Sequence, residues 1–134
     1  MTPESAQTFF AENFADWVQA LDLTITEFTP DHTLIRMPLA PRLNRVGGIV
    51  SGQALAALAD TTMVFAAIAK AGEFKPFATT DLHTQFLRPG TGTAILCRGM
   101  VTKAGRALVF ARADLTEESS GKLIATATAT FFAP

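Results

Sequence analysis

The longest apolar run of the chain lies between two regions of shorter, alternating segments. Residues 51–70 carry apolar side chains at almost every position of each helical turn, which predicts a helix covered on most sides. Residues 3–21 predict an amphipathic helix, and Thr2 and Pro3 supply its capping residue and its first helical residue. The long helix is expected to end at Ala71-Gly72.

The remaining segments alternate with the period of a β-strand. Thr29-Pro30-Asp31 and other turn residues separate them, and a loop rich in Pro, Gly and Arg spans residues 40–50. The predicted strands are 23–28, 32–39, 77–88, 93–103, 106–116 and 122–132. This order predicts a single α+β domain over residues 1–134, in which an antiparallel sheet covers the long helix. Because one sheet covers only one side of an all-apolar helix, we expect a homodimer or a dimer of dimers.

One charged residue interrupts the long apolar helix. Asp60 has Ala56, Met63, Val64 and Ala67 as its neighbours at helical spacing. Burying an unpaired carboxylate costs several kcal/mol and raises its pKa. Asp60 is therefore the first candidate for a catalytic group, and a structural carboxylate bonded to a buried hydroxyl is the alternative.

Composition removes several classes of function. Charged residues make up 17% of the 134 positions and the net charge is −1, so no basic surface for nucleic acid is expected. Cys97 is the only cysteine and residues 1–20 have no basic start, which favours a cytoplasmic location. Asp60 argues against a membrane span. The two histidines, His32 and His83, stand apart from other ligand types, so neither a metal nor another cofactor is expected.

Several short motifs resemble those of one enzyme family. Gly48, Ser51-Gly52, Leu58-Ala59-Asp60, Phe86-Leu87-Arg88-Pro89 and Gly105-Arg106 are similar to the motifs of hotdog-fold acyl-CoA thioesterases of the phenylacetic-acid-degradation type. The likeness covers roughly residues 30–132. It implies a sheet wrapped around the central helix and the hydrolysis of an acyl-CoA thioester, with coenzyme A entering only as part of the substrate.

The same resemblance implies roles for particular residues. It assigns Asp60 as the catalytic carboxylate and the amide of Gly52 as the oxyanion donor, and it matches Thr79 to a hydroxyl residue that helps to hold the attacking water. The family usually has His-Gly-Gly where this chain has Ser51-Gly52-Gln53. An upstream family Asn falls at Arg45, one residue from Asn44.

The spacing of the two main candidates predicts how the site is assembled. Gly52 and Asp60 are eight residues apart, or about 12 Å along a helix. One carbonyl cannot lie within roughly 3 Å of both. Either two antiparallel helices of a dimer share each site, or one of the two residues is not catalytic. Asp60 could act as a general base or attack the thioester directly, and the sequence leaves both mechanisms open.

Further substrate contacts are expected around the helix. Near its start we predict contacts at Asn44, Gly48, Ser51 and Gln53, with Ser51 also acting as the helix N-cap. An acyl pocket is expected from apolar helix residues and the N-terminal helix: Met63, Val64, Phe65 or Ala67 with Phe14 and Trp17. The candidates for the CoA phosphates are Arg45, Arg88, Lys103 and Arg106. Since the family histidine is absent, a non-catalytic acyl-CoA binding or sensing protein is the second functional hypothesis.

Overall fold

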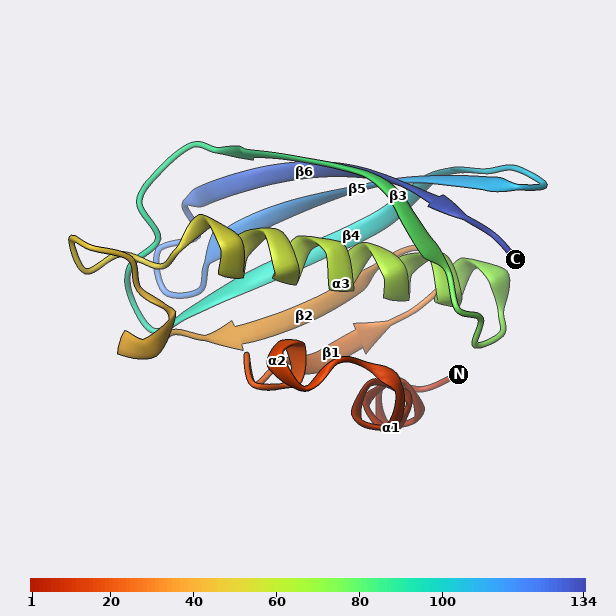
Figure 1. The fold of residues 1–134 in the computed structure, drawn as a ribbon, viewed down its shortest axis with the longest axis horizontal. Coiled ribbons are helices and arrows are strands. Elements are labelled where there is room, and N and C mark those ends of the chain that lie inside the picture. Colours follow the sequence, from red (N-terminus) through yellow and green to blue (C-terminus); the bar gives the residue numbers. More distant parts are fainter.

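A single antiparallel sheet of six strands lies against one long helix (Figure 1). The computed structural model describes residues 1–134. Along the sheet the strands run in the order β1-β2-β4-β5-β6-β3. The elements are α1 (Pro3–Asn13), α2 (Asp16–Gln19), β1 (Thr24–Phe28), β2 (Thr33–Pro38), a 3-10 turn (Pro41–Leu43), α3 (Gly52–Ala71), β3 (Ala78–Phe86), β4 (Ala94–Ala104), β5 (Leu108–Glu117) and β6 (Leu123–Phe132). The sheet around a central helix is the arrangement that the sequence predicts.

The predicted central helix is confirmed within one residue at each end. At its start the Ser51 hydroxyl accepts a hydrogen bond from the Ala54 amide at 3.3 Å, as expected of an N-cap. It ends at Gly72, whose φ of 76° favours glycine. By length and composition α3 could cross a membrane, but 67% of that stretch is buried within the fold, as in the core helix of a globular domain.

One stripe of α3 is left without a cover. Most of the helix packs against the sheet, and β4 approaches so closely that a Cβ on Gly99 would lie 3.0 Å from the Thr62 methyl group. Between its two ends, the residues of α3 that are not buried follow one helix face: Gln53, Ala56, Ala57, Asp60 and Val64. This stripe therefore faces away from the central strands of the sheet and toward the edge strand β3, and the candidate carboxylate belongs to it.

The prediction of one continuous N-terminal helix over residues 3–21 is wrong. The helix begins as expected, with a capping box between Thr2 and Ser5, but Phe14 adopts an extended conformation that separates α1 from α2. The Phe14 ring instead stacks on Phe65 of α3, with ring centroids 5.4 Å apart. The carbonyl of Phe14 accepts a hydrogen bond from the Gln19 side chain at 2.7 Å. Aromatic packing and this side-chain bond outweigh the helical period at the break.

Strand β3 forms one edge of the sheet. Leu82 and Phe86 pair with buried alanines of β6, so they lie on the face that looks toward α3, as the alternation predicts. Leu82 is nevertheless 38% exposed and Phe86 53% exposed, because no strand follows β3 on its outer side. The edge therefore offers unpaired backbone groups beside apolar side chains.

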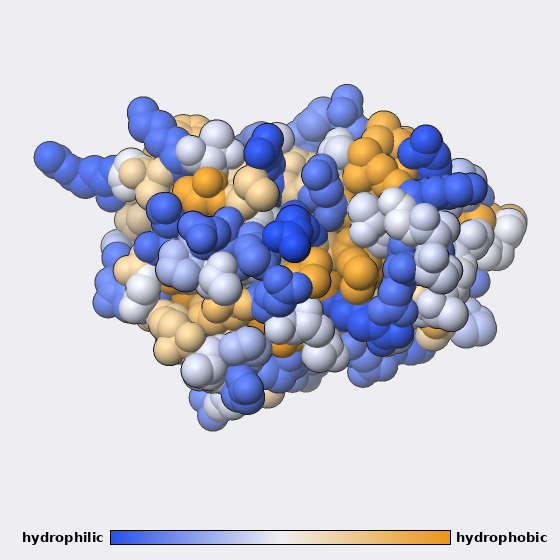
Figure 2. Space-filling view, turned by 180° about the vertical axis from the view of Figure 1, so that it is seen from behind, coloured by the Kyte–Doolittle hydropathy of each residue, from blue (hydrophilic) through white to orange (hydrophobic).

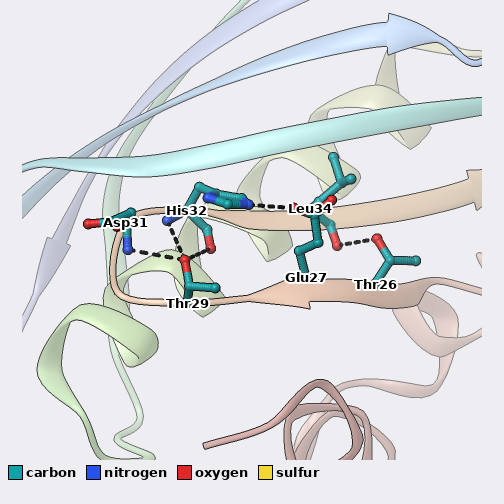
Figure 3. A network of polar contacts seen from close by, with 6 residues as sticks. All are labelled: Thr26, Glu27, Thr29, Asp31, His32 and Leu34. Atoms are coloured by element: carbon teal, nitrogen blue, oxygen red, sulfur yellow. Dashed lines mark hydrogen bonds and ion pairs between the residues drawn. The ribbon is translucent and has the colours of Figure 1, made fainter.

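A polar network closes the turn between β1 and β2 (Figure 3). The Thr29 hydroxyl accepts hydrogen bonds from the amides of Asp31 and His32 at 3.2 and 3.1 Å. Nε2 of His32 lies 2.6 Å from the Glu27 carboxylate. His32 is thus engaged in holding this turn, far along the chain from the candidate site.

Candidate functional site

Asp60 lies at an apolar cavity of about 480 Å³. The helix stripe supplies Ala57, Asp60, Thr61 and Val64, while α1, α2 and the segment before β3 supply the other walls. Four aromatic residues take part: Phe9, Phe14, Trp17 and Phe77. Of the predicted acyl-pocket residues, Phe14, Trp17 and Val64 are at this cavity. Met63, Phe65 and Ala67 are buried and do not line it; the Phe65 ring lies beneath those of Phe9 and Phe14.

Thr79 donates a hydrogen bond from its hydroxyl to Oδ1 of Asp60 at 2.8 Å. A bulge between Thr79 and Asp81 sets the local register of β3, and Thr79 pairs with the buried Phe131, which places it on the face toward α3. Burial raises the pKa of the Asp60 carboxyl, and the hydrogen bond from Thr79 acts in the opposite direction. The carboxylate is therefore both positioned and partly shielded from water.

Gly52 lies at a different cavity, of about 430 Å³. It is the first residue of α3, and its N–H makes no hydrogen bond within the chain, as is general for the first turn of a helix. The ring of Phe86 covers it so closely that a Cβ on Gly52 would lie 3.2 Å from the ring edge. Arg45 and Arg88 also line this cavity, so a free donor, an apolar ring and two cations meet there.

The two central candidates do not share a cavity within one chain. Asp60 faces the first cavity and Gly52 the second, and the separation of eight positions corresponds to about 12 Å of helix. A single carbonyl cannot contact both groups of one protomer. The geometric problem that the sequence poses is thus present in the folded chain.

The other predicted contacts fall at separate places. Gln53 is exposed on the first helical turn. Asn44 and Gly48 line a small third cavity of about 170 Å³ beside Gly90 and Gly92. Arg88 donates a hydrogen bond to the Leu123 carbonyl at 2.7 Å. The fold therefore does not gather all the predicted contacts of one chain around Asp60.

The sequence reasoning missed two parts of the Asp60 cavity. Lys75, Pro76 and Phe77 reach it from the connection between α3 and β3, and Phe9 and Asn13 reach it from α1. Among these residues only Phe9 is indicated by the sequence, because it belongs to the apolar side of the predicted N-terminal helix. The loop residues carry no such signal, because their position depends on how β3 returns across α3.

Other reactive groups do not assemble into a second centre. No group of three or more His, Cys, Asp and Glu side chains lies close enough together to hold a metal ion. Cys97 is fully buried, and burial raises the pKa of its thiol to about 12, so it stays protonated. Asp60 is thus the carboxylate that combines a raised pKa with a cavity.

Comparison with known proteins identifies the family. The family model described as the thioesterase superfamily matches residues 47–124, more than half of the chain. A search of curated proteins found no match. Among solved structures, zebrafish thioesterase superfamily member 2 is 24% identical, with a TM-score of 0.89 over 100% of this chain and 99% of that one.

Two bacterial structures are similar as well. A thioesterase family protein from Silicibacter pomeroyi is 24% identical, with a TM-score of 0.85 over 97% of this chain and 96% of that one. A thioesterase from Haemophilus influenzae is 20% identical, with a TM-score of 0.87 over 100% and 91%. At these identities the likeness establishes the fold, and the predicted hotdog fold is confirmed.

Proposed function

Because the chain belongs to the thioesterase superfamily, we propose that it is an acyl-CoA thioesterase that releases a free acid and CoA. Membership supports the hydrolysis of acyl thioesters in general. The observation that carries the narrower proposal is the carboxylate of Asp60, which lies at an apolar cavity and accepts a hydrogen bond from Thr79. An apolar cavity with few polar groups fits an acyl chain or an aryl acyl group.

In this proposal Asp60 does the chemistry on the thioester carbonyl. As a general base it takes a proton from water while the water oxygen attacks the carbonyl carbon. As a nucleophile it forms a mixed anhydride, which water then hydrolyses. In both routes the carbon–sulfur bond breaks and the thiolate leaves. The raised pKa makes Asp60 a stronger base than an ordinary aspartate, and Thr79 holds the carboxylate in place.

The amide of Gly52 supplies the second function, stabilisation of the oxyanion. A free N–H at the start of a helix points toward negative charge, and the helix dipole adds to its effect. Since Gly52 and Asp60 of one chain face different cavities, we place Gly52 of one protomer opposite Asp60 of its partner. Antiparallel α3 helices around a two-fold axis near Ala56 bring the two groups together and create two equivalent sites.

Two surfaces support such a dimer. The α3 stripe has no cover in one chain, and the edge of β3 has no neighbouring strand. Phe86 and Leu82 are partly exposed beside that edge. Pairing two β3 edges extends the sheet and covers these side chains in one step.

The direct test measures free-thiol release from a panel of acyl-CoAs. We expect Asp60→Asn and Asp60→Ala to lower kcat by at least about a hundredfold, because the base or nucleophile is gone. Asp31→Asn, which changes an exposed aspartate of the β1–β2 turn, is the matched control. If no thioester is cleaved while CoA esters still bind, the chain is a binding protein, the function that the absence of the family histidine at Ser51 favours. Turnover that survives both changes at Asp60 places the chemistry elsewhere.

A second pair of variants tests the amide of Gly52. Gly52→Pro removes the N–H, and proline is well tolerated at the first position of a helix. Gly52→Ala keeps the N–H and brings the same crowding against the Phe86 ring. Losing one oxyanion donor costs about 3 kcal/mol, so we expect proline to lower kcat roughly a hundredfold more than alanine does. Equal rates for the two variants would remove Gly52 from the mechanism.

A further inference from the structure

The ring of Phe86 covers the first turn of α3. A Cβ added to Gly52 would lie 3.2, 3.4 and 3.5 Å from three atoms of that ring. Gly52 does not have a positive φ, so its backbone conformation does not require glycine. The absence of a side chain at position 52 is therefore explained by the ring, which takes the space that a Cβ would need.

The same ring is poorly covered within one chain. Phe86 is 53% exposed, more than any other of the 11 phenylalanines. It lies on the α3 side of the sheet, because it pairs with the buried Ala125 of β6, and no strand follows β3 on its outer side. Exposure of so much of a ring forgoes the burial that usually stabilises phenylalanine. A group that arrives at the β3 edge therefore covers it.

The two ends of β3 correspond to the two central candidates on α3. Thr79 contacts Asp60, and Phe86, seven residues later, covers Gly52. In a regular strand an odd separation places two side chains on opposite faces. The bulge between Thr79 and Asp81 restores a common face, since Thr79 and Phe86 both pair with buried residues of β6. Both ends of β3 thus face α3, one beside each candidate.

The two-fold axis of the proposed dimer joins these ends across subunits. The axis near Ala56 sets Gly52 of one subunit opposite Asp60 of the partner. The same rotation exchanges the ends of β3, so it sets Phe86 beside Thr79 of the partner. In that dimer the ring gains the cover that a single chain lacks, and it adjoins the partner's Asp60 cavity.

We infer that Phe86 of one subunit is the wall beside the thioester carbonyl in the site shared with Asp60 of the partner, and that it selects acyl groups with an unbranched α-carbon. The inference rests on the proposed function, because it places the carbonyl oxygen on the amide of Gly52. A hydrogen-bonded oxygen lies about 2.9 Å from that nitrogen, and non-bonded carbon atoms approach to about 3.5 Å. With the ring edge beside Gly52, a CH₂ group next to the carbonyl fits, whereas a further methyl group there meets the ring.

The cavity at Asp60 receives the remainder of the acyl group. Its volume of about 480 Å³ leaves room for a methyl group far from the carbonyl. Discrimination by the position of a branch, and not by its presence, is therefore the signature of the ring as distinct from the size of the cavity.

The experiment compares hexanoyl-CoA, 2-methylhexanoyl-CoA and 5-methylhexanoyl-CoA. The measured quantity is the kcat/KM of each branched ester divided by that of hexanoyl-CoA. One methyl group that does not fit lowers kcat/KM about tenfold or more, so we expect a ratio below about 0.1 for the 2-methyl ester in wild type. Phe86→Ala should raise that ratio at least about fivefold and leave the ratio for the 5-methyl ester unchanged.

Phe132→Ala is the matched control. Phe132 is also a phenylalanine at the end of a strand and is 47% exposed, but it follows the buried Phe131 and so lies on the outer face of the sheet. Its replacement should leave both ratios unchanged. Phe86→Tyr keeps the ring and should keep both wild-type ratios.

Each result supports or overturns the inference. If wild type cleaves hexanoyl-CoA and the 2-methyl ester equally well, or if Phe86→Ala changes neither ratio, the ring does not select the acyl group while the thioesterase remains. An equal rise of both ratios shows a general loosening of the cavity and overturns selection at the α-carbon.

Binding replaces turnover if wild type cleaves none of the esters, in which case the proposed function fails. Titration calorimetry then measures Kd for the same three esters. The wall is supported if Phe86→Ala lowers Kd for the 2-methyl ester at least about fivefold relative to hexanoyl-CoA, and it is overturned if the relative Kd stays the same.

A cross-link tests the placement of the ring without any ester. Within one chain positions 79 and 86 are about 23 Å apart along a strand, whereas a disulfide needs Cα atoms within about 7 Å. The double variant Thr79→Cys/Phe86→Cys should therefore form a disulfide-linked dimer on oxidation, and each single variant should form much less. Cys97 is buried and does not compete. A double variant that folds but runs as a monomer on a non-reducing denaturing gel overturns the placement.

Discussion

The contact between Asp60 and Thr79 depends on one departure from the regular pattern in each of two elements, α3 and β3. Asp60 is the one acidic residue within α3, and a bulge in β3 lies next to Thr79. Their hydrogen bond of 2.8 Å stabilises the charged form of Asp60, whereas burial disfavours that form. Burial is the larger of the two effects, so the pKa of Asp60 stays raised.

Thr79 is accordingly predicted to be a positioning residue. Thr79→Val keeps the shape of the side chain but removes the donor, so the pKa of Asp60 should rise further. Because a base is active when deprotonated, the acidic limb of the kcat/KM profile should move to higher pH. A hydrogen bond to a charged group contributes about 1.5–3 kcal/mol, so kcat/KM near neutral pH should fall roughly tenfold to a hundredfold.

Thr79→Ser serves as the control because it keeps the hydroxyl. It should keep the wild-type position of the acidic limb. A profile that stays in place in Thr79→Val, with only the protein's stability lowered, would show that the hydroxyl is structural.

At the scale of elements, the break between α1 and α2 changes what the N-terminal segment does. A continuous helix would carry all its apolar residues along one side. The break instead leaves Trp17 on a single helical turn, 64% exposed and at the Asp60 cavity. Such a side chain contributes little to the core and can gain burial when an apolar ligand enters.

Trp17→Ala should therefore affect activity more than stability. We expect the free energy of unfolding to change by less than about 1 kcal/mol, since exposed positions contribute little. For long or aromatic acyl groups kcat/KM should fall roughly tenfold, and for acetyl-CoA it should change much less. Leu108→Ala, which removes an apolar side chain that is 41% exposed on β5, is the control for a general surface effect. Equal losses for acetyl and long acyl groups would contradict a role in the acyl cavity.

The turn between β5 and β6 is organised around one carboxylate. Glu117 accepts hydrogen bonds from the amides of Ser119 and Ser120 at 3.0 and 2.9 Å, and from the Ser119 hydroxyl at 2.6 Å. These donors lower the pKa of Glu117 from 4.5 to about 2. Gly92 packs against the same carboxylate so closely that a Cβ there would lie 2.6 Å from it. Glu117 therefore ties this turn to the connection between β3 and β4.

A pH-dependent contribution to stability follows from that lowered pKa. The carboxylate stabilises the fold fully above about pH 4.5, and this contribution is lost as the pH falls toward 2. Glu117→Gln should lower Tm at pH 7, and its difference from wild type should shrink between pH 4.5 and 2. Glu12→Gln, on the exposed side of α1, should show no such trend in the same thermal denaturation series. A difference that is constant with pH would mean that the charge of Glu117 does not matter.

At the scale of the whole molecule, the outer face of the sheet and the helix stripe differ in character. Seen from behind Figure 1, polar side chains interrupt the apolar ones (Figure 2). Arg98, Arg112 and Asp114 are exposed there on β4 and β5. The stripe of α3 contains alanines, Val64 and the single carboxylate Asp60, beside the unpaired edge of β3. The proposed shared site depends on the α3 stripe and on the β3 edge, not on the outer face of the sheet.

Mixing two inactive variants tests whether the site is shared. Gly52→Pro and Asp60→Asn each damage both sites of a homodimer. A mixed dimer rebuilds one intact site, from Gly52 of one subunit and Asp60 of the other. Random exchange makes half of the dimers mixed, so refolding the two together should restore about a quarter of wild-type turnover. A mixture as inactive as its parts would show that each site lies within one subunit.

The order and approximate bounds of the strands and of the central helix followed from the sequence, because hydrophobic period and turn residues are local properties. Ser51 and Gly72 marked the ends of α3 for the same reason: capping depends on one residue and its backbone. The sequence also singled out Asp60, since a charge within an apolar helix is visible without coordinates. It determined the spacing of Gly52 and Asp60, and with it the question of a shared site.

Other features depended on contacts between segments that are distant in the sequence. The helical period continues through Phe14, but stacking on Phe65 breaks the helix there. Met63 and Val64 are adjacent and equally apolar, yet the direction of the sheet buries Met63 and leaves Val64 at the cavity. Lys70, Lys75 and Arg106 line one cavity although they come from α3, from the connection to β3 and from the β4–β5 turn. Local pattern thus determined which elements form, and tertiary packing decided which of their side chains share a cavity, because only packing sets the distances between them.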